Sequence, residues 1–246
     1  MSKLLIAGGD SFVYGSGLSD HDQARWQHSL KTWPALLAGQ LSRDYVCRAV
    51  PGYSNSAIAR TVMLSCQQAL TQDILVVVNW TFLNRFEFRF AYNPWSTPVS
   101  ADGAALYSQW HNFNKLDYTR PGSHLQKSKQ SVLKFIDDFY RHVGHDDIYE
   151  YYVTLREIVL LQNFLKANDI PYIFSVAHNF FRKSLPDENI QCLLSQIDMD
   201  PWFFFPPLHG FVEWAKGYPH VEEHPSDLAH QDALVLVKEF FDEKIA

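Results

Sequence analysis

The chain has 246 residues, of which 47% are hydrophobic and 20% charged, and its formal net charge is −6. This composition favours a packed core over disorder, and the acidic balance argues against a general nucleic-acid binder, which would carry a basic stripe. The three cysteines are odd in number, far apart and without metal-ligand spacing, so neither a disulfide framework nor a zinc ribbon is expected.

The start of the chain predicts no secretory signal, because only four apolar residues stand between Lys3 and Gly8. No apolar stretch reaches the roughly 18 residues that would suggest a membrane span. We therefore expect a cytoplasmic protein without membrane contact. Incorporation into a virion or another larger assembly is compatible with the same features.

Four apolar runs predict buried strands at residues 4–7, 45–50, 74–78 and 172–176. Helical spacing of apolar residues lies between or after them. The expected helices cover residues 33–41, 57–70, 151–166 and 227–242. Ser226 is the expected N-cap of the last one, and the residues before 57 offer N-caps for the second.

Strands that alternate with helices favour an α/β fold, a mainly parallel sheet covered on both faces. We expect one domain over residues 1–246 with two long insertions, at about 84–148 and 180–222. Both are interpreted as loops and short helices over the carboxyl ends of the strands, where lids usually lie. The aromatic run within residues 200–207 favours core filling over a pocket wall.

A serine directly follows the first strand, in the turn Gly9-Asp10-Ser11-Phe12. Open α/β sheets place their chemistry outside the carboxyl ends of their strands. Near the other end of the chain, His224-Pro225 stands just before the last helix. Because a serine hydroxyl needs an adjacent base to become a nucleophile, this pair suggests a serine hydrolase.

Gly9-Asp10-Ser11-Phe12 resembles the first block of the SGNH/GDSL hydrolase family, and His224-Pro225 resembles its fifth. The resemblance implies a three-layer α/β/α fold of the flavodoxin-like SGNH type. It also implies that Ser11 is the nucleophile and His224 the base of an ester hydrolase acting on acyl or acetyl esters, including acetylated sugars. Gly52, after the second strand, matches the glycine whose backbone N–H helps to form the oxyanion hole.

Two positions depart from the family pattern. The acid expected three residues before the histidine is Val221, so we rank Glu222 first as its substitute. Other substitutes are Glu223, Asp227, a backbone carbonyl, a carboxylate from an insertion, or a serine–histidine dyad without an acid.

The oxyanion-hole asparagine expected after the third strand is also displaced. Asn79 comes earlier than the family position, and Asn55 from the second block is an alternative donor. Thr81 is a third candidate.

The predicted function is therefore a serine esterase or acyl hydrolase, and one form of it is a carbohydrate O-deacetylase. We expect no cofactor, no metal and no nucleic-acid partner, and a small-molecule or carbohydrate ester as substrate; an oligomer is compatible with the sequence. A metal site at His220, His224, Asp227 and His230 is disfavoured, because these residues fit a helix start better, with His230 structural. The alternative hypothesis is an SGNH-fold binding or structural module whose catalysis is impaired.

Overall fold

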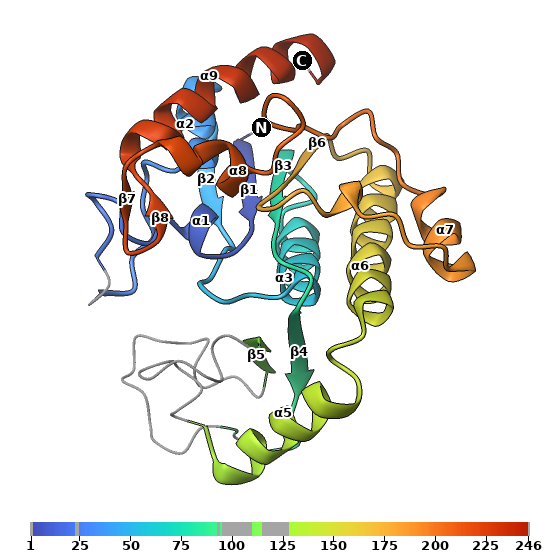
Figure 1. Cartoon of the computed structure of the whole chain (residues 1–246). Helices are drawn as coiled ribbons and strands as arrows, with labels where there is room; N and C mark the ends of the chain where they lie inside the picture. The colour runs from blue at the N-terminus through green and yellow to red at the C-terminus, as the bar shows by residue number, and fades with distance from the viewer. Residues whose placement is uncertain (1, 23–24, 93, 95–109, 115–127, 246) are drawn as a thin grey trace.

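Four parallel strands form the centre of the molecule (Figure 1). The computed structural model describes residues 2–22, 25–92, 94, 110–114 and 128–245. The strands of this sheet are β1 (Lys3–Gly8), β2 (Asp44–Cys47), β3 (Asp73–Trp80) and β6 (Tyr172–Val176). They lie in the order β2-β1-β3-β6. The four predicted strands are confirmed. The second is shorter than expected, because the chain turns away from the sheet before Pro51.

Two pairs of helices cover the two faces of this sheet (Figure 1). Helices α3 (Asn55–Gln68) and α6 (Asp147–Ala167) pack on the face that carries Leu4, Ile6 and Val76. Helices α2 (Trp33–Gln40) and α9 (Asp227–Lys244) pack on the other face, with the alternate side chains of the same strands. The predicted three-layer α/β/α architecture is confirmed.

The aromatic run after α7 (Glu188–Leu194) lies beside β6. The N–H of Phe174 donates to the carbonyl of Pro201 (2.9 Å), and the N–H of Phe203 donates to the carbonyl of Phe174 (2.8 Å). Trp202 packs into one core and Phe203 into the other, as in a strand buried on both faces. Core filling is therefore correct for this run. Its predicted place over the carboxyl ends of the strands is wrong, because the backbone of the run extends the sheet instead.

The first insertion contains more regular structure than the sequence predicted. Strands β4 (Arg85–Arg89) and β5 (Trp110–Asn114) form an antiparallel hairpin, and α5 (Gln130–His142) follows it. These elements lie beyond the carboxyl ends of β1 and β3 (Figure 1). Their side chains form a separate, mainly aromatic cluster that includes Phe86, Phe113 and Tyr140 together with the aliphatic Ile136. The rest of this insertion, residues 93, 95–109 and 115–127, lies outside the described residues.

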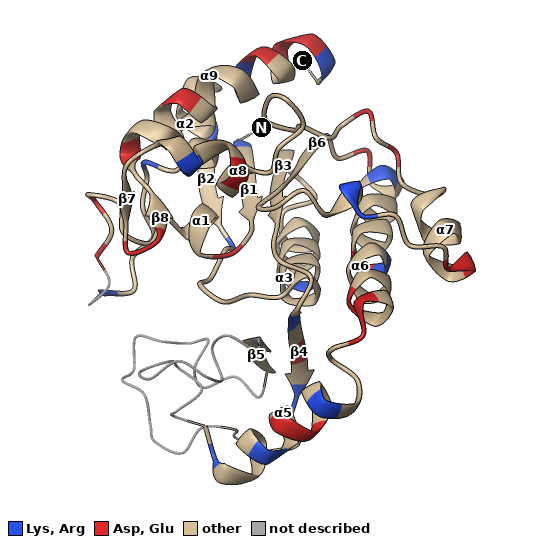
Figure 2. Cartoon of the chain, in the orientation of Figure 1, with Lys and Arg blue, Asp and Glu red and all other residues tan. Residues whose placement is uncertain are grey.

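The remaining elements are short. They are α1 (Ser11–Tyr14), η4 (Phe180–Arg182), α8 (Phe211–Trp214), η5 (Ala215–Gly217), β7 (His220–Val221) and β8 (His224–Pro225). Figure 2 shows Lys and Arg interspersed with Asp and Glu along helices such as α5 and α9. Within the described ranges, no helix has both the length and the apolar character that a membrane crossing requires.

His230 of α9 is a structural histidine inside the second core. It is 1% exposed, its Nδ1 accepts a hydrogen bond from the Trp33 N–H (3.1 Å), and its ring lies 4.7 Å from that of Phe211. Burial, offset in part by Asp227, lowers its pKa to about 3. The imidazole is therefore neutral in the folded protein near pH 7.

Acidification should weaken the fold through His230. Between pH 6.5 and about 3 this histidine is protonated in the unfolded chain but neutral in the folded protein. The free energy of unfolding therefore decreases as the pH is lowered through this range. At pH 4.5 this amounts to about 2–3 kcal/mol, at about 1.4 kcal/mol per pH unit. Glu150, whose pKa burial raises to about 7, acts in the opposite direction over this range. The test is therefore a difference between variants.

We expect the unfolding temperature of His230→Asn, whose amide oxygen can still accept from Trp33, to fall less between pH 6.5 and 4.5 than that of the natural protein. His220→Asn, at an exposed histidine bonded to a carbonyl, is the control and should follow the natural protein. Equal pH slopes for all three proteins would contradict the assignment.

Candidate active site

Ser11 lies at the tight turn that ends β1. Gly9 has to be glycine there, since a Cβ would stand 2.4 Å from the Cγ2 of Val13. Asp10 is the N-cap of α1 and accepts the Phe12 N–H (3.1 Å). Ser11 is the first residue of α1 and is 8% exposed. The sequence thus places this serine as expected, at the carboxyl end of a central strand.

The carboxylate of Asp10 is fully buried and forms an ion pair. Its Oδ2 accepts from Arg85 Nη1 (2.7 Å) and from the Thr81 hydroxyl (2.6 Å). The same Nη1 also donates to the Tyr53 carbonyl (3.3 Å). One arginine therefore joins the turn after β1 to the segments after β2 and β3.

The sequence alone did not indicate this role of Arg85. The available signal was that a carboxylate directly after a buried strand needs a cationic or hydroxyl partner. The side chain of Arg85 is 12% exposed, and its guanidinium carbon lies 5.0 Å from the ring centroid of Phe82. Among the described residues, its Nε and Nη2 donate to no acceptor.

The two asparagines proposed for the oxyanion hole are placed differently. Asn55 uses its whole side-chain amide: Oδ1 accepts the Thr81 N–H (2.8 Å), and Nδ2 donates to the Thr81 carbonyl (3.3 Å) and the Thr154 hydroxyl (3.0 Å). It connects α3, the end of β3 and α6. The Thr81 hydroxyl is likewise occupied, since it donates to Asp10.

Asn79 is fully buried on β3, on the same face as Leu75 and Val77, opposite Ser175 of β6. Neither its Oδ1 nor its Nδ2 meets a hydrogen-bond partner within the described residues. An unpaired buried amide lowers the free energy of unfolding, so Asn79 is a destabilising polar group in an otherwise apolar layer. In this arrangement neither the Asn55 nor the Asn79 side chain is available to a ligand.

Two backbone N–H groups are open instead. Gly52 has φ of +82°, a left-handed conformation that few side chains tolerate, and it lies in the segment after β2. Within the described part of the chain, neither its N–H nor that of Ser11 donates to another group. These are the two backbone donors that the sequence proposed for an oxyanion.

His224 is the first residue of β8, in the hairpin that β7 and β8 form with a two-residue turn. Glu222 and Glu223 form its turn, both with positive φ, 49° and 69°. The His224 Nδ1 lies 2.8 Å from the Glu222 carbonyl oxygen. Since a carbonyl only accepts, Nδ1 carries the hydrogen, and in the neutral ring Nε2 carries the lone pair that a base needs.

Glu222 therefore meets His224 through its backbone carbonyl. The sequence ranked the Glu222 carboxylate first for this contact and offered a backbone carbonyl as one alternative. The structure has no hydrogen bond or ion pair between the Glu222 carboxylate and the ring, both being within the described residues. The reason is the turn itself, which directs the carbonyl of its first residue back toward the histidine while leaving both glutamates exposed.

The other acid candidate near the helix start has different partners. Asp227 accepts from the backbone N–H and hydroxyl of Ser19 (3.1 and 2.5 Å) and from Lys31 (2.8 Å). Burial alone would raise its pKa, but Lys31 and Ser19 outweigh burial and lower the pKa to about 2. Asp227 thus links the start of α9 to the segment before α2 through hydrogen bonds and an ion pair.

The hairpin rests against the segment that follows Ser11. A Cβ on Gly17, whose φ is +81°, would lie 2.9 Å from the carbonyl oxygen of Val221, so the two backbones touch. The His224 ring packs 5.3 Å from the ring of Phe12, the neighbour of Ser11. Ser11 Oγ makes no hydrogen bond to any residue that the structure describes. The His224 ring therefore packs against the residue that follows Ser11, and no hydrogen bond joins the serine to the histidine in the described structure.

Chemically, this arrangement offers a hydroxyl, an imidazole with a fixed tautomer, two free backbone donors and a partly buried guanidinium. No group of three or more potential metal-ligating side chains occurs among the residues with described positions.

Comparison with known proteins gives a family and a set of similar folds. A family model described as a family of unknown function (DUF6071) matches residues 15–231. No curated protein sequence matches the chain.

Similar solved structures include an acetyl xylan esterase from the rumen bacterium Butyrivibrio proteoclasticus (12% identity, 99% of this chain and 64% of that one, TM-score 0.48). A carbohydrate esterase family 2 enzyme with a carbohydrate-binding domain from Corynascus thermopiles is another (12%, 98% and 66%, TM-score 0.49). A third is a psychrotrophic esterase from Pseudoalteromonas (11%, 98% and 100%, TM-score 0.47). The chain thus spans just under two thirds of the first two. At these identities none of them transfers a function.

Removing Arg85 should destabilise the protein strongly, because Asp10 would stay buried without its counter-charge. We expect Arg85→Ala to lower the free energy of unfolding by about 3–5 kcal/mol, measured by urea denaturation. Adding Asp10→Asn should restore part of the loss, since the amide oxygen can still accept from Phe12. The control is Arg141→Ala, which breaks an exposed ion pair with Asp137 and should cost about 1 kcal/mol or less. A similar small loss for Arg85→Ala would contradict the assignment.

Proposed function

The chain belongs to the DUF6071 family, a family of unknown function, and we propose that it is a serine-dependent ester hydrolase with Ser11 as nucleophile and His224 as base. The observation that carries this proposal is the His224 hairpin. It presents an imidazole of defined tautomer beside Phe12, next to the serine at the carboxyl end of β1. The resemblance of Gly9-Asp10-Ser11-Phe12 to a nucleophile block supports the same assignment.

In the proposed mechanism, Ser11 Oγ attacks the carbonyl carbon of an ester while His224 Nε2 takes its proton. The N–H groups of Ser11 and Gly52 stabilise the oxyanion that forms. The imidazolium then gives its proton to the leaving alcohol, and a water molecule, activated by the same imidazole, releases the acid from the acyl-enzyme. The missing bond between Ser11 and His224 is compatible with this, since such bonds often tighten only when substrate is present.

The substrate is proposed to be a small acyl or acetyl ester. A carbohydrate O-deacetylase remains the more specific prediction. Two of the similar structures are an acetyl xylan esterase and a carbohydrate esterase, which makes acetylated sugars the substrates to try first.

A binding or structural module without catalysis is the second candidate. The observations that favour it are the unbonded Ser11 hydroxyl and the engagement of Asn55 and Thr81 elsewhere, all within the described residues. A fluorophosphonate probe separates the candidates, because it labels an activated serine. Labelling of Ser11 supports the hydrolase, and an unlabelled Ser11 supports the module.

Replacing the nucleophile should abolish turnover. With p-nitrophenyl acetate as substrate, we expect Ser11→Ala to lower kcat/KM by at least about 10³-fold, as a removed nucleophile does in related chemistry. Ser195→Ala, at an exposed serine bonded to the Cys192 carbonyl, is the matched control and should retain full activity. Equal rates for Ser11→Ala and the natural protein would remove Ser11 from the mechanism.

The base should depend on the Glu222 carbonyl and not on the Glu222 carboxylate. We expect Glu222→Gln to keep kcat/KM within about threefold, whereas His224→Gln should lose about 10²–10⁴-fold, the usual contribution of a general base. His220→Gln controls for changes in the same hairpin. A loss for Glu222→Gln as large as that for His224→Gln would instead make the carboxylate a member of the triad.

A further inference from the structure

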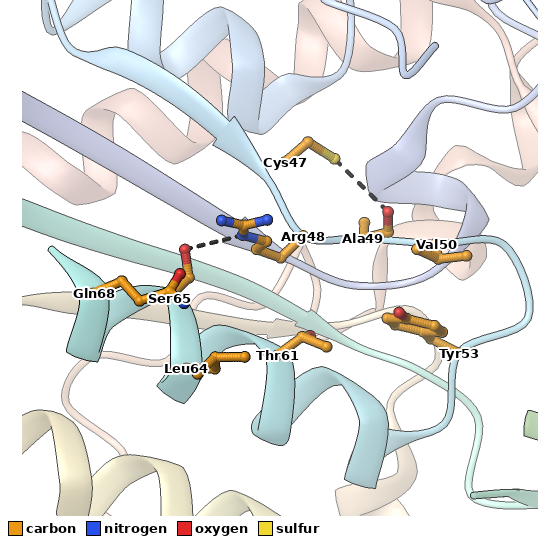
Figure 3. Close-up of a pocket in the computed structure, with 9 residues that line it drawn as sticks. All are labelled: Cys47, Arg48, Ala49, Val50, Tyr53, Thr61, Leu64, Ser65 and Gln68. Atoms are coloured by element: carbon orange, nitrogen blue, oxygen red, sulfur yellow. Dashed lines mark hydrogen bonds between the residues drawn. The ribbon is translucent and has the colours of Figure 1, made fainter. Parts of the chain in front are cut away.

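A pocket of about 330 Å³ lies between the end of β2 and helix α3 (Figure 3). Residues 47–50 and Tyr53 line it from the strand side, and four residues of α3 line it from the other: Thr61, Leu64, Ser65 and Gln68. Its volume is at the lower end of the range for small-molecule sites. It adjoins the segment that contains Gly52 but takes no part in the chemistry assigned to Ser11.

Arg48 is the one formally charged residue that lines this pocket. Its Nε donates to the hydroxyl of Ser65 (3.0 Å), a side chain that is itself 5% exposed. This bond fixes the guanidinium between the strand and the helix, as Figure 3 shows. Within the described chain, no carboxylate pairs with Arg48, and its two Nη groups donate to nothing.

The rest of the lining does not compete with an anion. Burial raises the pKa of Cys47 to about 11, so its thiol is neutral near pH 7. Gln68 and the hydroxyls of Thr61 and Ser65 add polar groups, and Tyr53 adds an aromatic face. An oriented guanidinium with free paired donors is the group that proteins use for carboxylates and phosphates.

The pocket shares a wall with the candidate active site. The side chain of Tyr53 lines the pocket, while its carbonyl accepts from Arg85, the partner of Asp10. Gly52 directly precedes it and offers its free N–H. Residues 48–53 thus connect the guanidinium of Arg48 to the free N–H of Gly52.

We propose that this pocket binds the carboxylate or phosphate group of a small polar molecule, and that the ester hydrolysed at Ser11 is an ester of such an acidic molecule. The second half rests on the proposed hydrolase function, whereas the first does not.

The binding half is tested by calorimetric titration of the protein with D-glucuronate, D-glucose 6-phosphate and D-glucose. We expect at least one of the two anions to bind at least tenfold more tightly than glucose, and the stronger one identifies the anion that the pocket takes. The proposal is overturned when neither anion binds more tightly than the neutral sugar.

Arg48→Gln should lose at least tenfold in affinity for the anion. Arg48→Lys keeps the charge but loses the paired donors of the guanidinium, so its affinity should lie between those of Arg48→Gln and the natural protein. Arg141→Gln removes the same charge on α5 and should bind like the natural protein. Because Arg48 is exposed, the fold should persist, which circular dichroism checks. Unchanged affinity of a folded Arg48→Gln would overturn the assignment.

The link to hydrolysis is tested with O-acetylated D-glucuronate, O-acetylated D-glucose 6-phosphate and O-acetylated D-glucose. Arg48→Gln should raise KM at least tenfold for the preferred acidic ester and leave the neutral ester unchanged. If the natural protein hydrolyses none of these esters or p-nitrophenyl acetate, the hydrolase function fails, and the link fails with it. The titration still decides the pocket in that case. Hydrolysis with an Arg48-independent KM would overturn the link alone.

Discussion

The buried ion pair between Asp10 and Arg85 is the constraint on which the candidate site depends. A fully buried carboxylate is stable only when its lone pairs are satisfied, and Asp10 has three donors: the Phe12 N–H, the Thr81 hydroxyl and Arg85. These contacts hold the turn of the proposed nucleophile against the end of β3. Because Arg85 also donates to Tyr53, the segment with Gly52 is held by the same charge.

Through this ion pair the β4–β5 hairpin helps to position the loops of the candidate site. Arg85 is the first residue of β4, and further along the strand Glu87 forms a two-point ion pair with Arg60 of α3 (2.6 and 3.0 Å). Asn112 of β5 accepts from the N–H and hydroxyl of Ser54, the N-cap of α3. An insertion with its own aromatic cluster is thus attached where the segment after β2 becomes a helix.

The sequence predicted those parts whose signal is local. Apolar runs of strand length gave the four strands, and the glycine-rich turn placed Ser11 at the end of the first. The segment beside β6 was missed because an unbroken aromatic run has no polar alternation that would distinguish a two-faced strand from a loop. Arg85 was missed because its partner lies 75 positions away in the chain. A backbone carbonyl was among the partners that the sequence offered for His224, but it could not be ranked first because a carbonyl carries no side-chain signature.

The Glu222 carbonyl that accepts from His224 limits how strongly the protein can stabilise an imidazolium at this position. A carboxylate would stabilise the imidazolium by a full opposite charge, whereas a carbonyl supplies only a dipole. The positive charge of Arg85 would oppose protonation of the ring, but Asp10 neutralises it at 2.7 Å. In the proposed mechanism the oxyanion then supplies a counter-charge to the imidazolium, and the two charges form together. Such a base is better matched to esters than to amides, because an alkoxide leaves with less help from a proton than an amide nitrogen needs.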